Sequence, residues 1–291
     1  MAANLAVLYV VFGSTYLAIR VMVETIPALV GAGLRFLVAG LLLYGWCTLR
    51  RGYIPRLDAR QFGGTVLIGL LVIGGGLGLL TVGEKTVPSG LAALLIASVP
   101  AWVVLLRAVN RERVRLVTGV GVVVGFAGVA LLGGTSGEVA LTGIVILLVA
   151  AVSEAIGSYY TPRFSLPEDP ILSSAVQMLV VGPVLLLAGL GVGEQIHPSL
   201  WSGHSLLALI YLIGPGSILA YASFVWLVSR APASIATTYA YVNPVVALFL
   251  GWLILDEKIT TGILVGAILI IVGVAAVLSG ENRSEERALT R

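Results

Sequence analysis

Long stretches without a charged side chain are the feature that most constrains this sequence. About ten apolar runs are separated by short segments that hold most of the Asp, Glu, Lys and Arg residues. About 20 apolar residues in helical form cross the hydrocarbon core of a bilayer. Charged residues make up only 11% of the chain and hydrophobic residues 58%, whereas a water-soluble domain has roughly 25% charged residues. Lipid is therefore the solvent for most of this chain.

The backbone restricts the form that these runs take. A bilayer offers no water to satisfy N–H and C=O groups, so a spanning segment is either a helix or part of a closed barrel. Continuous apolar runs favour helices over the short alternating strands of a barrel. We therefore predict an all-α integral membrane protein with about ten transmembrane helices. The expected spans are Asn4–Val21, Pro27–Leu49, Phe62–Val82, Pro88–Leu106, Val114–Leu132, Leu141–Tyr160, Ile171–Leu190, Leu206–Val228, Pro232–Leu255 and Thr260–Leu278.

The distribution of basic residues predicts the orientation. If the N-terminus is inside the cell, thirteen of the 17 Lys and Arg residues fall on the cytoplasmic side. Only Arg20, Lys85 and Lys258 fall on the opposite side, and Arg35 lies within a span. This asymmetry predicts a multi-pass protein of the cytoplasmic (inner) membrane with both termini in the cytoplasm. It also accounts for the net charge of +3, so we expect no nucleic acid as a partner.

An internal repeat relates the two halves of the chain at a spacing of about 144 residues. The corresponding pairs are Pro88 and Pro232, Pro100 and Pro244, Glu112 and Glu257, Gly121 and Gly266, and Gly128 and Gly273. Because each half has an odd number of spans, the second half enters the membrane from the opposite face. The expected fold is therefore two inverted five-helix repeats, at residues 1–135 and 136–280, with a cytoplasmic tail at 281–291.

An inverted repeat is typical of secondary transporters, in which two halves expose a central site to each side in turn. The alternative is a duplicated bundle without transport, for instance a lipid-handling enzyme or a scaffold. The sequence has no HExxH, GxSxG or Gly-rich phosphate loop, so metalloprotease, hydrolase and ATPase functions lack their machinery. A channel would need rings of pore-lining charges. We expect a transporter and not an enzyme.

Several blocks of the sequence resemble EamA-type members of the drug/metabolite transporter superfamily. They are Phe12-Gly13-Ser14-Thr15-Tyr16, Gly33-Leu34-Arg35-Phe36, Gly125-Phe126-Ala127-Gly128 and Tyr241-Val242-Asn243-Pro244. The resemblance implies ten helices in a five-plus-five arrangement, a central cavity, and export of amino acids or related amphipathic metabolites. Some members are driven by protons and others are facilitators, so proton coupling, facilitation and export of drugs or lipids stay open.

Arg35 is the first candidate for substrate binding. It lies about eight residues, or roughly 12 Å, into the second span, where a charge costs at least about 2.5 kcal/mol on insertion scales. Its guanidinium can bind a substrate carboxylate through two parallel hydrogen bonds. The alternative is a structural role in which Arg35 bonds to helix carbonyl groups.

Glu154 is the candidate for proton coupling. It lies deep in the sixth span among small residues such as Ala151 and Ala155, and burial away from water disfavours a charged carboxylate. A carboxylate in that setting suits a proton carrier. Structural pairing with Arg35 is the alternative, and the resembled family often has an aromatic residue at this position.

The ninth span has the polar side chains expected of a binding cavity. Tyr239, Tyr241 and Asn243 precede Pro244, and rings with hydroxyl groups suit an amphipathic substrate. Packing between helices is the alternative. Weaker candidates for binding are Tyr16, Trp102 and Tyr160, because aromatic side chains are common at any membrane interface.

The remaining notable residues predict few other partners. Pro100 and Pro244 interrupt backbone hydrogen bonding in corresponding spans and are candidate hinges. One cysteine, Cys47, and two histidines, His197 and His204, do not form a metal-binding pattern. We expect no metal and no cofactor. The partners expected are a small-molecule substrate, membrane lipid and, if transport is coupled, protons, with the chain as a monomer or homodimer.

Overall fold

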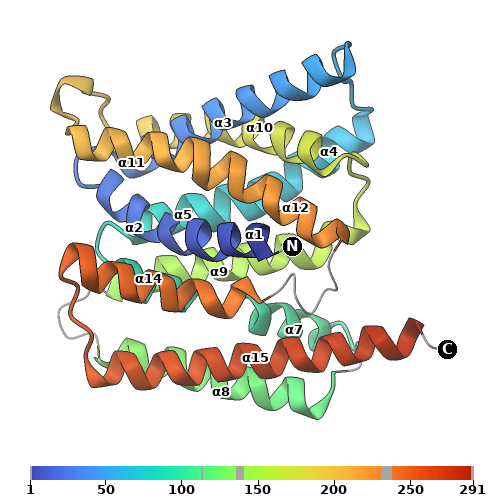
Figure 1. The fold of residues 1–291 in the computed structure, drawn as a ribbon, viewed down its shortest axis with the longest axis vertical. Helices are drawn as coiled ribbons and strands as arrows, with labels where there is room; N and C mark the ends of the chain where they lie inside the picture. Colours follow the sequence, from blue (N-terminus) through green and yellow to red (C-terminus); the bar gives the residue numbers. More distant parts are fainter. Residues whose placement is uncertain (1, 113, 136–140, 231–237, 290–291) are drawn as a thin grey trace.

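Long helices run side by side through the molecule (Figure 1). The computed structural model describes residues 2–112, 114–135, 141–230 and 238–289, and every regular element in these residues is a helix. The elements of the first half are α1 Ala2–Val7, η1 Leu8–Phe12, α2 Gly13–Met22, α3 Ala28–Arg51, α4 Ala59–Gly69, η2 Leu70–Gly78, α5 Leu79–Gly83, α6 Ser89–Ile96, α7 Val99–Val109 and α8 Leu116–Thr135. Those of the second half are α9 Leu141–Tyr160, η3 Thr161–Arg163, α10 Pro170–Gly191, η4 Pro198–Leu200, α11 Gly203–Ile213, η5 Gly214–Leu219, α12 Ala220–Arg230, α14 Tyr239–Leu255 and α15 Thr261–Leu289.

The apolar runs of the sequence form these helices. Within the described residues, eight helical stretches are long and apolar enough to cross a membrane. Two shorter apolar helices, Leu116–Leu132 and Tyr239–Leu255, accompany them. The all-helical architecture is thus confirmed for the described residues. The expected ninth span begins at residues that lie outside the described part of the chain, and α15 continues past the expected end at Leu278 to Leu289.

Four of the expected spans are interrupted, which the apolar pattern alone does not predict. The π-helical segments η1, η2 and η5 lie within the first, third and eighth expected spans. Gly74-Gly75-Gly76 in η2 and Gly214-Pro215-Gly216 in η5 weaken regular α-helical bonding. A fourth break, at Ala97 and Ser98, separates α6 from α7.

Helix ends follow local capping chemistry. Asp58 caps α4 by accepting a hydrogen bond from the backbone nitrogen of Gln61 at 2.7 Å. Asp169 caps α10 in the same way, and α3 ends at Gly52, whose φ of 72° lies in the left-handed region.

α1 begins and α15 ends toward the same side of the bundle in Figure 1, here called the termini end. The opposite side, where α2 ends and α3 begins, is called the far end.

Two long helix pairs frame the bundle. α3 packs along α10 at one edge, and α8 packs along α15 at the other. Between them, α2 contacts α11, α14 and α6, while α9 contacts η2, α5 and α7. The main buried cluster joins residues of α2, α6, α9, α11 and α15. The middle of the bundle is therefore built from both halves of the chain.

Candidate functional site

Tyr16, Glu154 and Tyr239 come together in the middle of the bundle from α2, α9 and α14. Tyr16 interacts electrostatically with Glu154, with Glu84 and with Tyr239, and Tyr239 interacts with Glu154. The Glu154 side chain packs against Gly76 of η2. In the described residues no hydrogen bond or ion pair reaches its carboxylate. Three of the residues predicted from the sequence therefore share one site, here called the central site.

Aromatic rings enclose one side of the central site. Phe12 of η1 meets the Tyr239 ring edge to face at 5.9 Å between centroids. Phe224 of α12 meets the same ring at 5.7 Å. A cavity of about 230 Å³ borders Tyr239 and the candidate hinge Pro100, together with Val103, Arg107 and residues of α15. Tyr239 thus borders both the aromatic rings and this mostly apolar cavity.

Arg35 of α3 lies nearer the far end and is 5% exposed. Its Nε donates a hydrogen bond to Ser217 Oγ in η5 at 2.9 Å, and its guanidinium lies 4.9 Å from the centre of the Phe36 ring. Arginine has five N–H donors. Within the described part of the chain, Ser217 takes the one hydrogen bond that Arg35 donates, so the two terminal amino groups are available to a ligand. Among these residues Arg35 forms no ion pair with a carboxylate, so the alternative of a structural pair with Glu154 is not seen there.

Glu84 is a buried charge at the far end that the sequence analysis did not single out. It follows α5, is fully buried, and neither carboxylate oxygen has a hydrogen-bond partner among the described residues. Arg20 and Arg35 interact with it electrostatically, and Arg20 donates to the backbone carbonyl groups of Glu84 and Lys85. Its position at the end of an apolar run made it look like an ordinary loop charge.

The other predicted residues lie around the central site or away from it. Asn243 is buried with its Oδ1 unpartnered, and the Trp102 Nε1 is likewise buried and unpartnered among the described residues. Trp102 packs edge to face on Phe126 at 4.7 Å. Tyr241 is partly buried against the main core cluster. Tyr160 lies apart from this group, at the termini end of α9, where its ring packs against Tyr159 at 4.9 Å.

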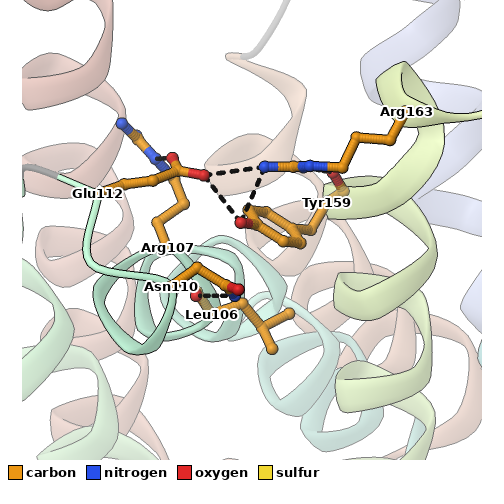
Figure 2. Close-up of polar contacts among 6 residues, drawn as sticks. All are labelled: Leu106, Arg107, Asn110, Glu112, Tyr159 and Arg163. Atoms are coloured by element: carbon orange, nitrogen blue, oxygen red, sulfur yellow. Dashed lines mark hydrogen bonds and ion pairs between the residues drawn. The ribbon is translucent and has the colours of Figure 1, made fainter.

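A second polar cluster lies at the termini end around Glu112 (Figure 2). Its carboxylate accepts hydrogen bonds from Arg107 Nε at 2.8 Å, Tyr159 Oη at 2.8 Å and Arg163 at 2.9 Å. The Arg163 guanidinium also lies 4.0 Å from the centre of the Tyr159 ring. These bonds, that of Arg107 foremost, lower the pKa of Glu112 below its usual value. The cluster ties the end of α7 to the end of α9.

Two glutamates cap helices at the far end from distant parts of the sequence. Glu257 accepts from the backbone nitrogens of Ser89 and Gly90 at the start of α6, at 2.7 and 3.2 Å. Glu194 accepts from those of Leu29 and Val30 at the start of α3, at 3.3 and 2.9 Å. A carboxylate at a helix N-terminus satisfies free N–H groups and complements the helix dipole. The far end is therefore held together by contacts that involve both halves of the chain.

The side chains in and around this site are mainly aromatic and polar. Within the described residues no group of three or more His, Cys, Asp or Glu side chains is placed to hold a metal ion. His197 pairs with Gln195 in the loop after α10, at 2.9 Å. The central site offers the Glu154 carboxylate and two phenol hydroxyls from three different helices, and the Arg35 guanidinium lies nearer the far end.

Comparison with known proteins gives the same fold and class. The model of the EamA-like transporter family matches residues 1–134 and 141–279. The chain is 40% identical over 84% of its length, and 79% of the relative's, to YedA of Escherichia coli (strain K12), named an uncharacterized inner membrane transporter. It is 27% identical to the uncharacterized transporter YoaV of Bacillus subtilis (strain 168) over 91% of both chains. A protein of known crystal structure superimposes with a TM-score of 0.66 at 20% identity, covering 96% of both chains, which shows the fold alone.

Proposed function

This chain belongs to the EamA-like transporter family, and we propose that it is a secondary transporter that exports small metabolites across the inner membrane by alternating access. The proposed cargo is amino acids or related amphipathic compounds. The proposed domains are residues 1–135 and 136–280, followed by a tail at 281–291. The two segments matched by the family model, 1–134 and 141–279, support this division.

The contact between α8 and α15 is the observation that carries the proposed inverted repeat. Gly121 and Gly128 correspond to Gly266 and Gly273 at the repeat spacing. A Cβ on Gly121 would lie 2.7 Å from the carbonyl oxygen of Gly273, and one on Gly128 would lie 2.8 Å from that of Gly266. Each residue thus meets the counterpart of the other, as a two-fold axis between the helices requires. This exchange supports a second half inserted in the opposite sense.

Irregular segments recur at the same spacing. η2 begins at Leu70 and η5 begins at Gly214, which matches the repeat spacing of about 144 residues. Local π-helical turns are frequent at functional sites. Here η2 contacts Glu154 through Gly76, and η5 contacts Arg35 through Ser217. Corresponding irregularities in the two halves thus support a shared central site.

The two shorter apolar helices complete the proposed count of ten crossings. α14 has 17 residues, which at about 1.5 Å per residue approaches the lower limit for a span. With ten crossings, the termini end faces the cytoplasm, where the positive-inside rule places the basic loops. Arg20, Lys85 and Lys258 then lie on the outer side, at the far end.

The charges near the central site favour a substrate with a carboxylate. The unoccupied amino groups of Arg35 suit a bidentate pair with such a group, while Glu154, Tyr16 and Tyr239 suit an ammonium and an apolar side chain. Tyr241, Asn243, Trp102 and Tyr160 are retained as proposed lining residues, and Pro100 and Pro244 as proposed hinges. Glu154, with no partner among the described residues, is the proposed proton carrier. A facilitator without proton coupling is the alternative.

A ligand screen followed by transport tests the proposal. Purified protein is heated with individual amino acids and related metabolites, since a ligand that binds the native state raises its apparent melting temperature by mass action. Each hit is then tested for counterflow in proteoliposomes. We expect at least one carboxylate-bearing metabolite to stabilise the protein and to exchange across the membrane. Stabilisation without exchange would contradict a transport function.

A further inference from the structure

A cavity outside the central site lies at the termini end, between the end of α3 and the start of α10. Its volume is about 300 Å³, and it is lined by Trp46, Cys47, Arg50, Arg51, Asp169 and Ile171. Nothing in the proposed transport cycle uses this cavity. Its lining residues belong to α3 and to the start of α10, and this helix pair forms one edge of the bundle (Figure 1).

The side chains that line this cavity carry a net positive charge, because two arginines face one aspartate. Arg51 forms an ion pair with Asp169 at 2.8 Å, and Asp169 also caps α10 through Ile171 and Leu172. The Asp169 charge is therefore already neutralised. Arg50 is exposed and has no hydrogen bond or ion pair among the described residues. The Arg50 guanidinium, with its N–H donors unpaired, lies beside the Arg51 guanidinium, which is partly paired with Asp169. Such a pair of guanidinium groups suits the oxygens of a phosphate.

The helix face next to Arg50 is apolar and exposed. Leu42, Trp46 and Leu49 are 54%, 57% and 82% exposed, and helical spacing places them on the same side of α3 as Arg50. Tryptophan is enriched at the level of lipid headgroups. The arrangement provides an apolar surface for an acyl chain that ends at a positive charge one turn beyond Trp46.

We propose that this cavity binds the phosphate of an anionic phospholipid, with Arg50 as its main contact and Leu42, Trp46 and Leu49 along the acyl chain. Basic pockets between transmembrane helices on the cytoplasmic side bind anionic headgroups. The inference is independent of the transported substrate. A free phosphate ion has the same headgroup chemistry but makes no use of the apolar face.

Lipid-dependent stability of the full-length protein tests this site. Melting temperature is measured in neutral detergent after addition of phosphatidylglycerol, of phosphatidylcholine, or of inorganic phosphate alone. The melting temperature of the unaltered chain should rise more with phosphatidylglycerol than with phosphatidylcholine, and little with inorganic phosphate. Arg50→Gln should lose at least half of the phosphatidylglycerol gain. The matched control is Arg60→Gln, which removes the same charge from an exposed site near this end of the bundle and should keep the gain.

Three results would overturn the site: an unchanged gain in Arg50→Gln, an equal loss in Arg60→Gln, or a full gain with inorganic phosphate alone. If Arg50→Gln does not fold, Arg50→Lys keeps the charge but loses the planar fork. Native mass spectrometry then compares how much phosphatidylglycerol stays bound. Arg50→Lys should retain less than Arg60→Lys, and equal retention would contradict the proposal.

Discussion

The carboxylate of Glu257 lies 2.7 Å from the backbone nitrogen of Ser89, although the two residues are 168 positions apart. A Cβ at Gly251 would collide with Glu257 Oε2, so the absence of a side chain there leaves room for this contact. Glu112 is the counterpart of Glu257, and its backbone nitrogen donates to the carbonyl oxygen of Arg107 as that of Glu257 donates to the carbonyl oxygen of Gly251. Arg107 binds Glu112 at 2.8 Å. Two corresponding glutamates therefore have different partners at the two ends of the bundle.

The contact between Glu257 and Ser89 should stabilise the first turn of α6 against local unfolding. Glu257→Gln keeps one acceptor oxygen but places an amide donor beside backbone N–H groups, which costs about 1 kcal/mol of local stability. We expect faster amide hydrogen exchange in residues 89–96 of this variant. Asp256→Asn, at the exposed neighbouring residue, should exchange as the unaltered chain does. Equal exchange in all three proteins would show that the cap does not restrain α6.

Arg35 should be needed for transport more than for folding. Arg35→Lys retains the positive charge but loses the fork that binds a carboxylate, so transport of the identified substrate should fall by at least about tenfold. Its melting temperature should stay close to that of the unaltered chain. Ser217→Ala, which removes the hydrogen bond to Arg35 Nε, should have a smaller effect on transport. Loss of expression and folding in Arg35→Lys would instead assign Arg35 a structural role.

Glu154 should determine the response of transport to a pH gradient. Glutamine has nearly the same shape but cannot release a proton, so Glu154→Gln should transport at a rate that no longer follows the gradient. Ser158→Ala, one turn along α9, is the control and should keep the response. The measurement is substrate flux in proteoliposomes with imposed pH differences. An unchanged response in Glu154→Gln would exclude Glu154 as the proton carrier.

Asp169 should stabilise the fold at neutral pH but not in acid. Burial alone raises the pKa of Asp169, but hydrogen bonds from Arg51 and from the backbone nitrogens of Ile171 and Leu172 outweigh it and place the pKa below its usual value. A lowered pKa stabilises the folded chain above the unfolded pKa of about 3.9, and this stabilisation is lost as the pH falls through the folded pKa.

The matching experiment compares melting temperatures across pH. Asp169→Asn should be less stable than the unaltered chain by about 1 kcal/mol near pH 7, and the difference should shrink below about pH 4. Glu168→Gln, at the exposed residue before it, should show little difference at any pH. If the difference in stability between Asp169→Asn and the unaltered chain stays the same in acid, the assigned role of Asp169 is contradicted.

Helix positions could be predicted from the sequence because lipid leaves few alternatives for an uncharged apolar run. The breaks within the helices could not be predicted in this way. Nothing in the apolar pattern distinguishes η2 or η5 from the α-helix around it, because both backbones bury the same side chains. Pro100 illustrates the limit. It was predicted to interrupt a span, and it lies in the first turn of α7 just after the break at Ala97 and Ser98, whereas Pro244 lies inside α14.

The candidate site was predictable where a charge is deep in a span, as for Arg35 and Glu154. Partners distant in sequence were not predictable, so the bond from Arg35 to Ser217 and the grouping of Tyr16 with Tyr239 required the structure. Glu84 was missed because its place beside Lys85 suggested a solvated loop. Tyr160, a proposed lining residue, lies in the last turn of α9 beside Tyr159 and Arg163, and these neighbours also required the structure.

The opposite insertion of the two halves is the central claim, and cysteine labelling tests it most directly. In a Cys47→Ala background, single cysteines at Lys85, Lys258, Arg56 and Glu168 are exposed to a membrane-impermeant maleimide in intact cells. Lys85→Cys and Lys258→Cys should be labelled, whereas Arg56→Cys and Glu168→Cys should react only after permeabilisation. Labelling that places residues 85 and 258 on opposite sides of the membrane would contradict the inverted repeat and the transport mechanism that rests on it.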